Sequence, residues 1–125
     1  MAPVQLRTGI DLIEVDRIRE TLERYGDHFC ERVFTPQELA EAGGRISSLA
    51  ARFAAKEAAS KALGTGIGIV CWKDIEILYG PDNKPIVHLH GEAARLSSEQ
   101  RLHTWSVSLS HTRLYAVAVV VAIGE

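Results

Sequence analysis

Apolar positions in the first part of the chain recur at two different spacings. Residues 4–10 alternate apolar and polar side chains, which predicts a short strand ending at Asp11. Over 14–29 the apolar residues return every three or four positions, which predicts a helix with one face toward the core. Gly26 lies inside this helical pattern, so we expect it to interrupt or end the helix.

A short helix is expected next. Thr35 and Glu38 stand at capping-box spacing, with Pro36 at the first helical position between them. This pattern predicts a helix from Pro36 to about Glu41, which the glycine pair at 43–44 separates from the following segment.

The longest expected helix is rich in alanine and ends at Leu63. Ser47 or Ser48 could cap its N-terminus. The alanines at 51, 54, 55, 58 and 62 share one broad face, which can therefore approach a neighbouring element closely. The other face is expected to carry the chemistry, through Phe53, Glu57, Ser60 and Lys61.

The second half of the chain changes to a period of two. Strands are expected at 74–78 and 86–89, joined by the turn formers of 80–85, where Asn83 can adopt a left-handed conformation. A helix at 92–100 precedes strands at 105–110 and 115–123. Since helices precede most of the strands, the order favours an α+β domain with an antiparallel sheet over a repeating βαβ fold.

The composition indicates a single globular domain over residues 1–125. Apolar residues make up 46% of the chain and charged residues 24%, and the formal net charge of −2 argues against bulk affinity for nucleic acid. No uncharged apolar run reaches about 18 residues, and the N-terminus lacks the pattern of a secretory leader. We expect a cytoplasmic protein with no membrane partner and no nucleic-acid partner.

Two acids far apart in sequence suggest a cation site. Taken alone, Glu57 four residues before Lys61 is a common surface ion pair, and Asp11 is an ordinary strand-end or capping residue. Together the two carboxylates match Mg²⁺, which takes one or two protein carboxylates and completes its octahedron with water and phosphate oxygens.

The glycine loop, residues 64–68, suggests a phosphate contact. The cations Arg52, Lys56 and Lys61 precede it, so charge and exposed backbone donors would lie near one another. The loop lacks the lysine and hydroxyl residue that follow the glycines of a Walker motif. It also follows a helix, whereas a dinucleotide fingerprint follows a strand.

Other polar residues leave alternatives open. Arg17 and Arg24 lie opposite the apolar stripe of the 14–29 helix, either as a solvated face or as a dock for an acidic protein. His111 follows a strand with three serines on one face and no GxSxG motif, so we expect it to donate a hydrogen bond at a strand end. His88 and His90 lack a further clustered ligand and stay unassigned.

Two motifs resemble those of a known family. The segments GIDLIEVDRI at 9–18 and RFAAKEAASKALGTGIG at 52–68 are similar to motifs of the 4′-phosphopantetheinyl transferases, and within them of the small holo-acyl-carrier-protein synthase group. Weaker similarity follows in order at 72–77, 84–85 and 107–112, so the resemblance spans nearly the whole chain. It implies an antiparallel sheet packed against a long central helix, and a homotrimer with active sites between subunits.

The resemblance also implies an activity, which is transfer of phosphopantetheine from coenzyme A to a serine of an apo acyl carrier protein, releasing adenosine 3′,5′-bisphosphate. Asp11 and Glu57 would bind Mg²⁺, Lys61 would hold a phosphate, and Arg17 and Arg24 would dock the acidic helix of the carrier. Glu57 and Lys61 would be the catalytic residues, with either Glu57 or a metal-activated water as the base. The implied coenzyme A contacts are Arg45, Arg52, Lys61, Gly64, Thr65, Gly66, Gly68, Asn83, Lys84, Pro85, His111 and Thr112.

The chain departs from the family pattern at two places. Arg45 is the one basic residue of AGGRISS, where similar proteins often carry several, and Asn83 replaces the usual glycine before Lys84 and Pro85. Two other functions remain open on the residues alone. They are a Mg²⁺-dependent nucleotide pyrophosphatase, and a non-catalytic module that binds coenzyme A or a carrier.

Overall fold

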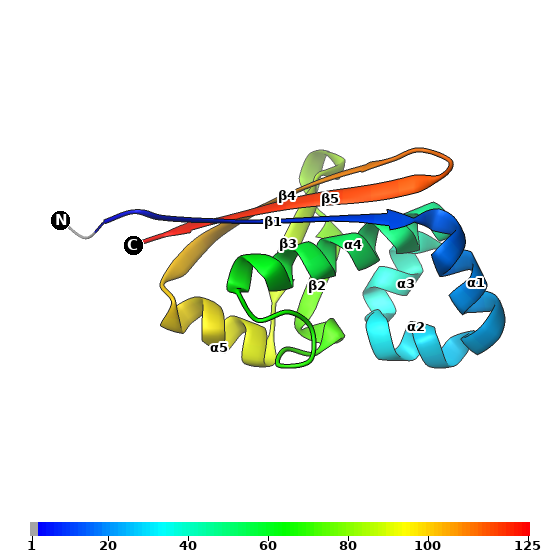
Figure 1. The fold of residues 1–125 in the computed structure, drawn as a ribbon, viewed down its shortest axis with the longest axis horizontal. Coiled ribbons are helices and arrows are strands. Elements are labelled where there is room, and N and C mark those ends of the chain that lie inside the picture. Colours follow the sequence, from blue (N-terminus) through cyan, green and yellow to red (C-terminus); the bar gives the residue numbers. More distant parts are fainter. Residues whose placement is uncertain (1–2) are drawn as a thin grey trace.

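A long helix packs between two antiparallel sheets in the computed structural model, which describes residues 3–125 (Figure 1). One sheet has the strand order β1-β5-β4, and the other is the hairpin β2-β3. The α+β class, the antiparallel pairing and the long central helix expected from the sequence are confirmed. The helices are α1 (Val15–Tyr25), α2 (Asp27–Val33), α3 (Pro36–Ala42), α4 (Ile46–Leu63) and α5 (Gly91–Glu99), and the strands are β1 (Gln5–Glu14), β2 (Ile75–Tyr79), β3 (Pro85–Leu89), β4 (Leu102–His111) and β5 (Tyr115–Gly124).

The first and last strands pair along their whole length. β1 and β5 run antiparallel from Gln5 opposite Gly124 to Glu14 opposite Tyr115, so the first and last strands lie side by side (Figure 1). The expected strand end at Asp11 is therefore wrong. β1 continues to Glu14 because β5 supplies pairing partners that far, and Asp11 is a residue within the strand.

A glycine brings β1 unusually close to α4. A Cβ atom on Gly9 would stand 1.8 Å from the carbonyl oxygen of Ala58, which is far inside van der Waals contact. The facing alanines at 54, 55, 58, 59 and 62 are all buried, which confirms that the small-residue face of α4 packs against a neighbour. Because side chains alternate along a strand, Arg7, Asp11 and Ile13 point to the same side as Gly9.

The start of α4 differs from the expectation. Neither Ser47 nor Ser48 caps this helix, because it begins at Ile46, and Arg45 at the N-cap position makes no side-chain capping bond. The hydroxyl of Ser48 instead accepts a hydrogen bond from Arg52. The first turn of α4 therefore keeps backbone N–H groups without a side-chain cap.

The turns between the short helices follow the sequence pattern closely. The expected 14–29 helix is two helices, α1 and α2, because Gly26 takes φ 52° and ψ −123° between them. The capping box of α3 is confirmed, since the Thr35 amide donates to Glu38 Oε1 at 2.9 Å and the Glu38 amide donates to Thr35 Oγ1 at 3.2 Å. Among residues 3–125 no helix combines the length and hydropathy needed to span a bilayer.

The second half of the chain forms the expected strands, with shifted ends. The turn between β2 and β3 covers Pro81–Asn83, and Asn83 has the left-handed conformation expected of it, with φ 56°, as does Asp82, with φ 60°. β4 begins at Leu102, three residues earlier than expected, because it pairs with β5 as far as Gly124. An irregularity between Leu102 and Thr104 breaks the alternation there, which hides this part of the strand from the sequence pattern.

Replacing Gly9 by alanine should push β1 away from α4, because the added methyl group would overlap the carbonyl of Ala58. We expect the free energy of unfolding to fall by about 1–3 kcal/mol, measured by urea denaturation. Thr8→Ala alters the opposite face of the same strand and serves as the control, with an expected loss below about 1 kcal/mol. Equal losses in the two variants would show that the close approach does not hold the strand on the helix.

Candidate active site

Three charged residues singled out in the sequence meet where β1 crosses α4. Lys61 Nζ donates to the carbonyl oxygen of Ile10 at 2.9 Å and lies 3.4 Å from Asp11 Oδ1. Glu57 lies one helical turn before Lys61, and Asp11 is near enough for its charge to act on the Glu57 carboxyl. The structure thus brings Asp11, Glu57 and Lys61 together from positions about fifty residues apart.

The electrostatics of this group favour a cation. Partial burial raises the pKa of Glu57, the charge of Asp11 raises it further, and Lys61 opposes both effects. A divalent ion between the two carboxylates would remove their repulsion. Residues 3–125 contain no group of three or more His, Cys, Asp or Glu side chains suited to a metal. A pair of carboxylates suits an ion such as Mg²⁺, which draws its other ligands from water and phosphate.

Lys56 does not belong to this group, contrary to the expectation that it flanks the glycine loop. Its ammonium is fully buried, where it donates to Glu38 Oε1 at 2.7 Å and to the carbonyl oxygens of Trp72 and Ile75 at 3.1 and 2.6 Å. Burial lowers the pKa of Lys56, and the carboxylate of Glu38 counteracts that effect. Lys56 ties α4 to α3 and β2, so its charge is not available to a phosphate. Ser60, also expected on the functional face, is buried as well, and its hydroxyl donates to the carbonyl of Glu57 at 2.7 Å.

Arg52 is likewise enclosed, with 1% of its surface exposed. Its Nε donates to the carbonyl of Ile77 at 3.1 Å, one terminal nitrogen donates to Glu41 Oε1 at 2.6 Å, and the other donates to Ser48 Oγ. Arg52 thus holds Glu41 and Ser48, two residues that line a cavity at the start of α4. It does not face the cavity, although the family resemblance places it among the coenzyme A contacts.

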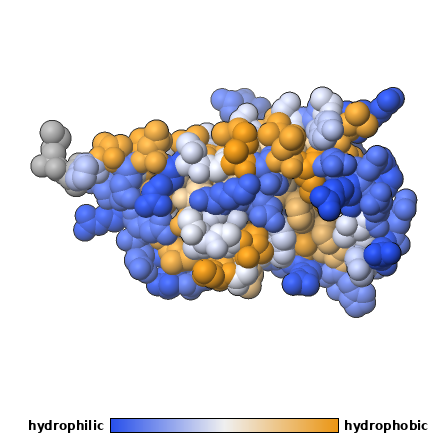
Figure 2. Space-filling view, in the orientation of Figure 1, coloured by the Kyte–Doolittle hydropathy of each residue, from blue (hydrophilic) through white to orange (hydrophobic). Residues whose placement is uncertain are grey.

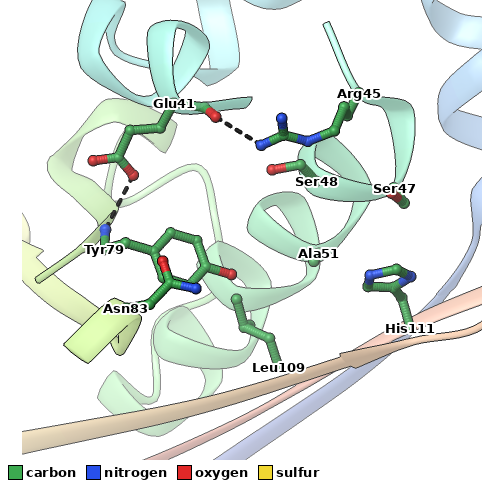
Figure 3. Close-up of a pocket in the computed structure, with 9 residues that line it drawn as sticks. All are labelled: Glu41, Arg45, Ser47, Ser48, Ala51, Tyr79, Asn83, Leu109 and His111. Atoms are coloured by element: carbon green, nitrogen blue, oxygen red, sulfur yellow. Dashed lines mark hydrogen bonds between the residues drawn. The ribbon is translucent and has the colours of Figure 1, made fainter. Parts of the chain in front are cut away.

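A cavity of about 710 Å³ opens at the start of α4 (Figure 3). It contains Arg45, Asn83 and His111, three of the implied coenzyme A contacts, and Arg45 donates to the backbone carbonyl of Glu41 at 2.9 Å. Lys84 follows Asn83 directly in the chain. The sequence patterns did not point to the other lining residues, which are Glu41, Ser47, Ser48, Ala51, Tyr79 and Leu109. Tyr79 could have been found as a candidate from the sequence, because it is an aromatic residue at the end of an expected strand, next to a turn.

A second hollow, of about 590 Å³, adjoins this end of the molecule. His111, Thr112 and Arg113 from the β4–β5 connection line it, together with Ser47 of α4. Thr112 Oγ1 also accepts hydrogen bonds from the amides of residues 114 and 115, at 3.2 and 3.1 Å, so this hydroxyl shapes the hairpin.

The glycine loop lies at the opposite end of α4. Gly64, Gly66 and Gly68 have φ values of 81°, 69° and 126°, and no atom lies within 4 Å of the place a Cβ would occupy. The Thr65 hydroxyl donates to the carbonyl of Gly66 at 3.0 Å. From Ser48 at the cavity to Lys61 the helix rises about 20 Å. One chain therefore carries the cavity and the carboxylates, but holds them apart.

The two arginines expected to dock a partner lie on α1. Arg17 and Arg24 line one shallow hollow of about 580 Å³, which also includes Tyr25. Arg17 borders a second, apolar cavity of about 280 Å³ whose wall includes Phe53. This face of α1 therefore shares a cavity with Phe53, which precedes Glu57 by one turn of α4.

The match to known proteins decides the family. The model of the 4′-phosphopantetheinyl transferase superfamily matches residues 7–120. The chain belongs to this superfamily. A holo-[acyl-carrier-protein] synthase of Herpetosiphon aurantiacus is 46% identical over 126 residues, which cover 95% of this chain and 99% of the relative.

Solved structures agree with the family assignment. The Helicobacter pylori holo-[acyl-carrier-protein] synthase in complex with coenzyme A matches with a TM-score of 0.85 and 37% identity. The match covers 92% of the present chain and 98% of the Helicobacter pylori chain. The synthase of Bacillus anthracis in complex with CoA (3′,5′-ADP) has a TM-score of 0.77 and 39% identity, covering 95% and 96%. The family inferred from the motifs at 9–18 and 52–68 is confirmed.

Proposed function

We propose that this protein transfers the 4′-phosphopantetheine group of coenzyme A to a serine of an apo acyl carrier protein. The products are the holo carrier and adenosine 3′,5′-bisphosphate. The meeting of Asp11, Glu57 and Lys61 between β1 and α4 carries this proposal, in a chain whose relatives are synthases of this kind.

The reaction is an in-line displacement at phosphorus. The serine oxygen attacks the β-phosphorus of coenzyme A, and the bond from that phosphorus to the bridging oxygen breaks, so adenosine 3′,5′-bisphosphate leaves with the bonding electrons. Glu57, one helical turn before Lys61, accepts the serine proton. Lys61, whose side chain is 52% exposed, holds a phosphate oxygen and offsets charge on the leaving group.

Asp11 and Glu57 are the residues that would hold Mg²⁺ in this mechanism. The two carboxylates repel one another, and the absence of a larger ligand cluster from residues 3–125 leaves coordination positions for water and phosphate oxygens. When bound, the ion neutralises charge on the pyrophosphate during the displacement. The positions of Asp11 and Glu57 would therefore determine where the pyrophosphate binds.

Coenzyme A would use both ends of α4. Its nucleotide would occupy the cavity at the start of the helix, which Arg45 and His111 line and where the first turn has no side-chain cap. Its pyrophosphate needs Lys61 at the other end, about 20 Å away along the helix. One nucleotide cannot bridge that separation, so we propose that the cavity of one subunit serves the carboxylates of a neighbour.

The outer face of the three-stranded sheet is suited to joining such subunits. Leu6, Ile10 and Leu12 of β1 are 64%, 59% and 64% exposed, beside Val119 and Ile123 of β5. Hydrophobic side chains gather on this side of the molecule (Figure 2). An apolar face of this extent marks an interface, and we propose that it assembles the homotrimer.

Transfer is tested by incubating the protein with coenzyme A, Mg²⁺ and several apo carriers, with the carrier mass as readout. The parent should add one phosphopantetheine group per carrier. Asp11→Asn and Lys61→Ala should slow transfer by about 10²–10³-fold, because each removes a group that offsets charge in the transition state. Glu99→Gln, an exposed acid on α5, is the matched control and should transfer normally.

Other outcomes of this assay separate the competing functions. No mass gain on any carrier would refute the transferase. Cleavage of coenzyme A without a carrier would identify a nucleotide pyrophosphatase. Binding of coenzyme A that survives combined Asp11→Ala and Glu57→Ala changes, with no turnover by the parent, would identify a binding module.

Charge reversal on α1 tests carrier docking. Arg17→Glu combined with Arg24→Glu should raise the KM for the carrier by about tenfold or more, because an acidic partner would then meet like charge. The KM for coenzyme A should stay near that of the parent. Arg95→Glu on α5, at the other end of the molecule, is the control (Figure 1). An equal rise in both KM values would contradict a docking role.

Assembly is tested by placing charge on the apolar sheet face. The parent should have the mass of a trimer in light scattering, and Ile10→Lys with Leu12→Lys should give a folded monomer that transfers little. Ile86→Lys, on the separate β2–β3 hairpin, should remain trimeric. A monomeric parent, or a trimeric Ile10/Leu12 variant, would refute this interface.

A further inference from the structure

The cavity of Figure 3 contains an aromatic ring to which the family resemblance gives no role. Tyr79 is the last residue of β2, and 39% of its surface is exposed. Its ring lies on the same side of the cavity as the Asn83 amide (Figure 3). The cavity volume of about 710 Å³ is ample for a nucleotide.

The ring of Tyr79 is held in place from behind. The Tyr79 amide donates to Glu41 Oε1 at 3.0 Å, and the same oxygen accepts from Arg52 at 2.6 Å. The guanidinium carbon of Arg52 lies 5.2 Å from the ring centroid, which is the geometry of a cation–π contact. Because Arg52 is buried and bound on all sides, it supports a ring that is rigid and still open to the cavity.

The remaining lining residues change in character across the cavity. Ala51 and Leu109 are apolar, and Arg45 and His111 lie across from Tyr79 (Figure 3). A flat ring on one side, apolar surface between and a cation opposite match a ligand with a planar base joined to an anionic group. Adenosine with a phosphate on its ribose has this shape, and it forms one end of coenzyme A.

We infer that the adenine base of coenzyme A stacks on the ring of Tyr79. Arg52 acts through that ring as a positioning residue, by holding it against Glu41. The Asn83 amide, with one donor group and one acceptor, is placed to meet the edge of the base. The inference rests on the proposed function for its ligand, and it adds a residue that decides how tightly the nucleotide is held.

The test measures binding of adenosine 3′,5′-bisphosphate by calorimetry and steady-state transfer for the same variants. Tyr79→Leu should weaken binding of the bisphosphate by about 5- to 100-fold, since stacking on an aromatic ring is lost. The KM for coenzyme A should rise by a similar factor. Its kcat and its KM for the carrier should match the parent. Tyr79→Phe keeps the ring and should restore tight binding.

Ile86→Ala is the matched control, because Ile86 is also 39% exposed and lies on the same hairpin. It should bind the bisphosphate like the parent. The inference is wrong if Tyr79→Leu binds like the parent, if Ile86→Ala loses as much affinity, or if the loss falls on kcat. Calorimetry needs no turnover. If the parent binds the nucleotide but transfers nothing, the proposed transferase is refuted, and binding by the Tyr79 variants still tests the stacking.

Arg52 is tested in combination with Tyr79. If Arg52 acts through the ring, Arg52→Lys alone should weaken binding of the bisphosphate. The same change made in the Tyr79→Leu variant should cause no further loss of affinity. Losses that add would show that Arg52 contacts the nucleotide itself and would overturn its positioning role. Circular dichroism checks that the Arg52 variant folds. If it does not fold, the Tyr79 variants still test whether the base stacks on the Tyr79 ring.

Discussion

The close approach of β1 to α4 at Gly9 is the contact on which the site depends. The strand backbone rests against the carbonyl of Ala58, where any side chain on residue 9 would collide. Two residues further along the same face stands Asp11, beside Glu57. Lys61 closes the arrangement by donating to the carbonyl of Ile10. The acid pair therefore exists because small residues let two backbones touch.

The opposite side of α4 is anchored by buried charge. Lys56 with Glu38, and Arg52 with Glu41, join the helix to α3 and to β2. Both acids also accept backbone amides of β2, so little hydrogen-bonding capacity is left unused. Removing one member of such a pair leaves an uncompensated charge in the interior, which costs far more than the intact pair contributes. One helix thus holds the charges proposed for catalysis on one side and structural charges on the other.

The length of α4 is the basis for proposing that the active site is shared between subunits. Along the helix axis, Ser48 at the cavity is about 14 Å from Glu57 and about 20 Å from Lys61. Neither end by itself provides both a nucleotide pocket and a place for phosphoryl transfer. An apolar outer sheet face next to β1 offers a way to bring the two ends of different subunits together.

Local sequence patterns were enough to predict most helices and strands and the family. The capping box at Thr35 and the break at Gly26 depend on local hydrogen bonds and backbone geometry, so the sequence pattern predicted them. The two motifs at 9–18 and 52–68, which contain Asp11, Glu57 and Lys61, identified the superfamily. Which charged residues are enclosed depends on packing between distant segments, which these patterns do not encode. Lys56 and Lys61 look alike in a helical pattern, but acceptors from α3, Trp72 and β2 converge on the former. The extra length of β1 and the support of Tyr79 by Arg52 likewise came from partners distant in sequence, which a local pattern does not encode.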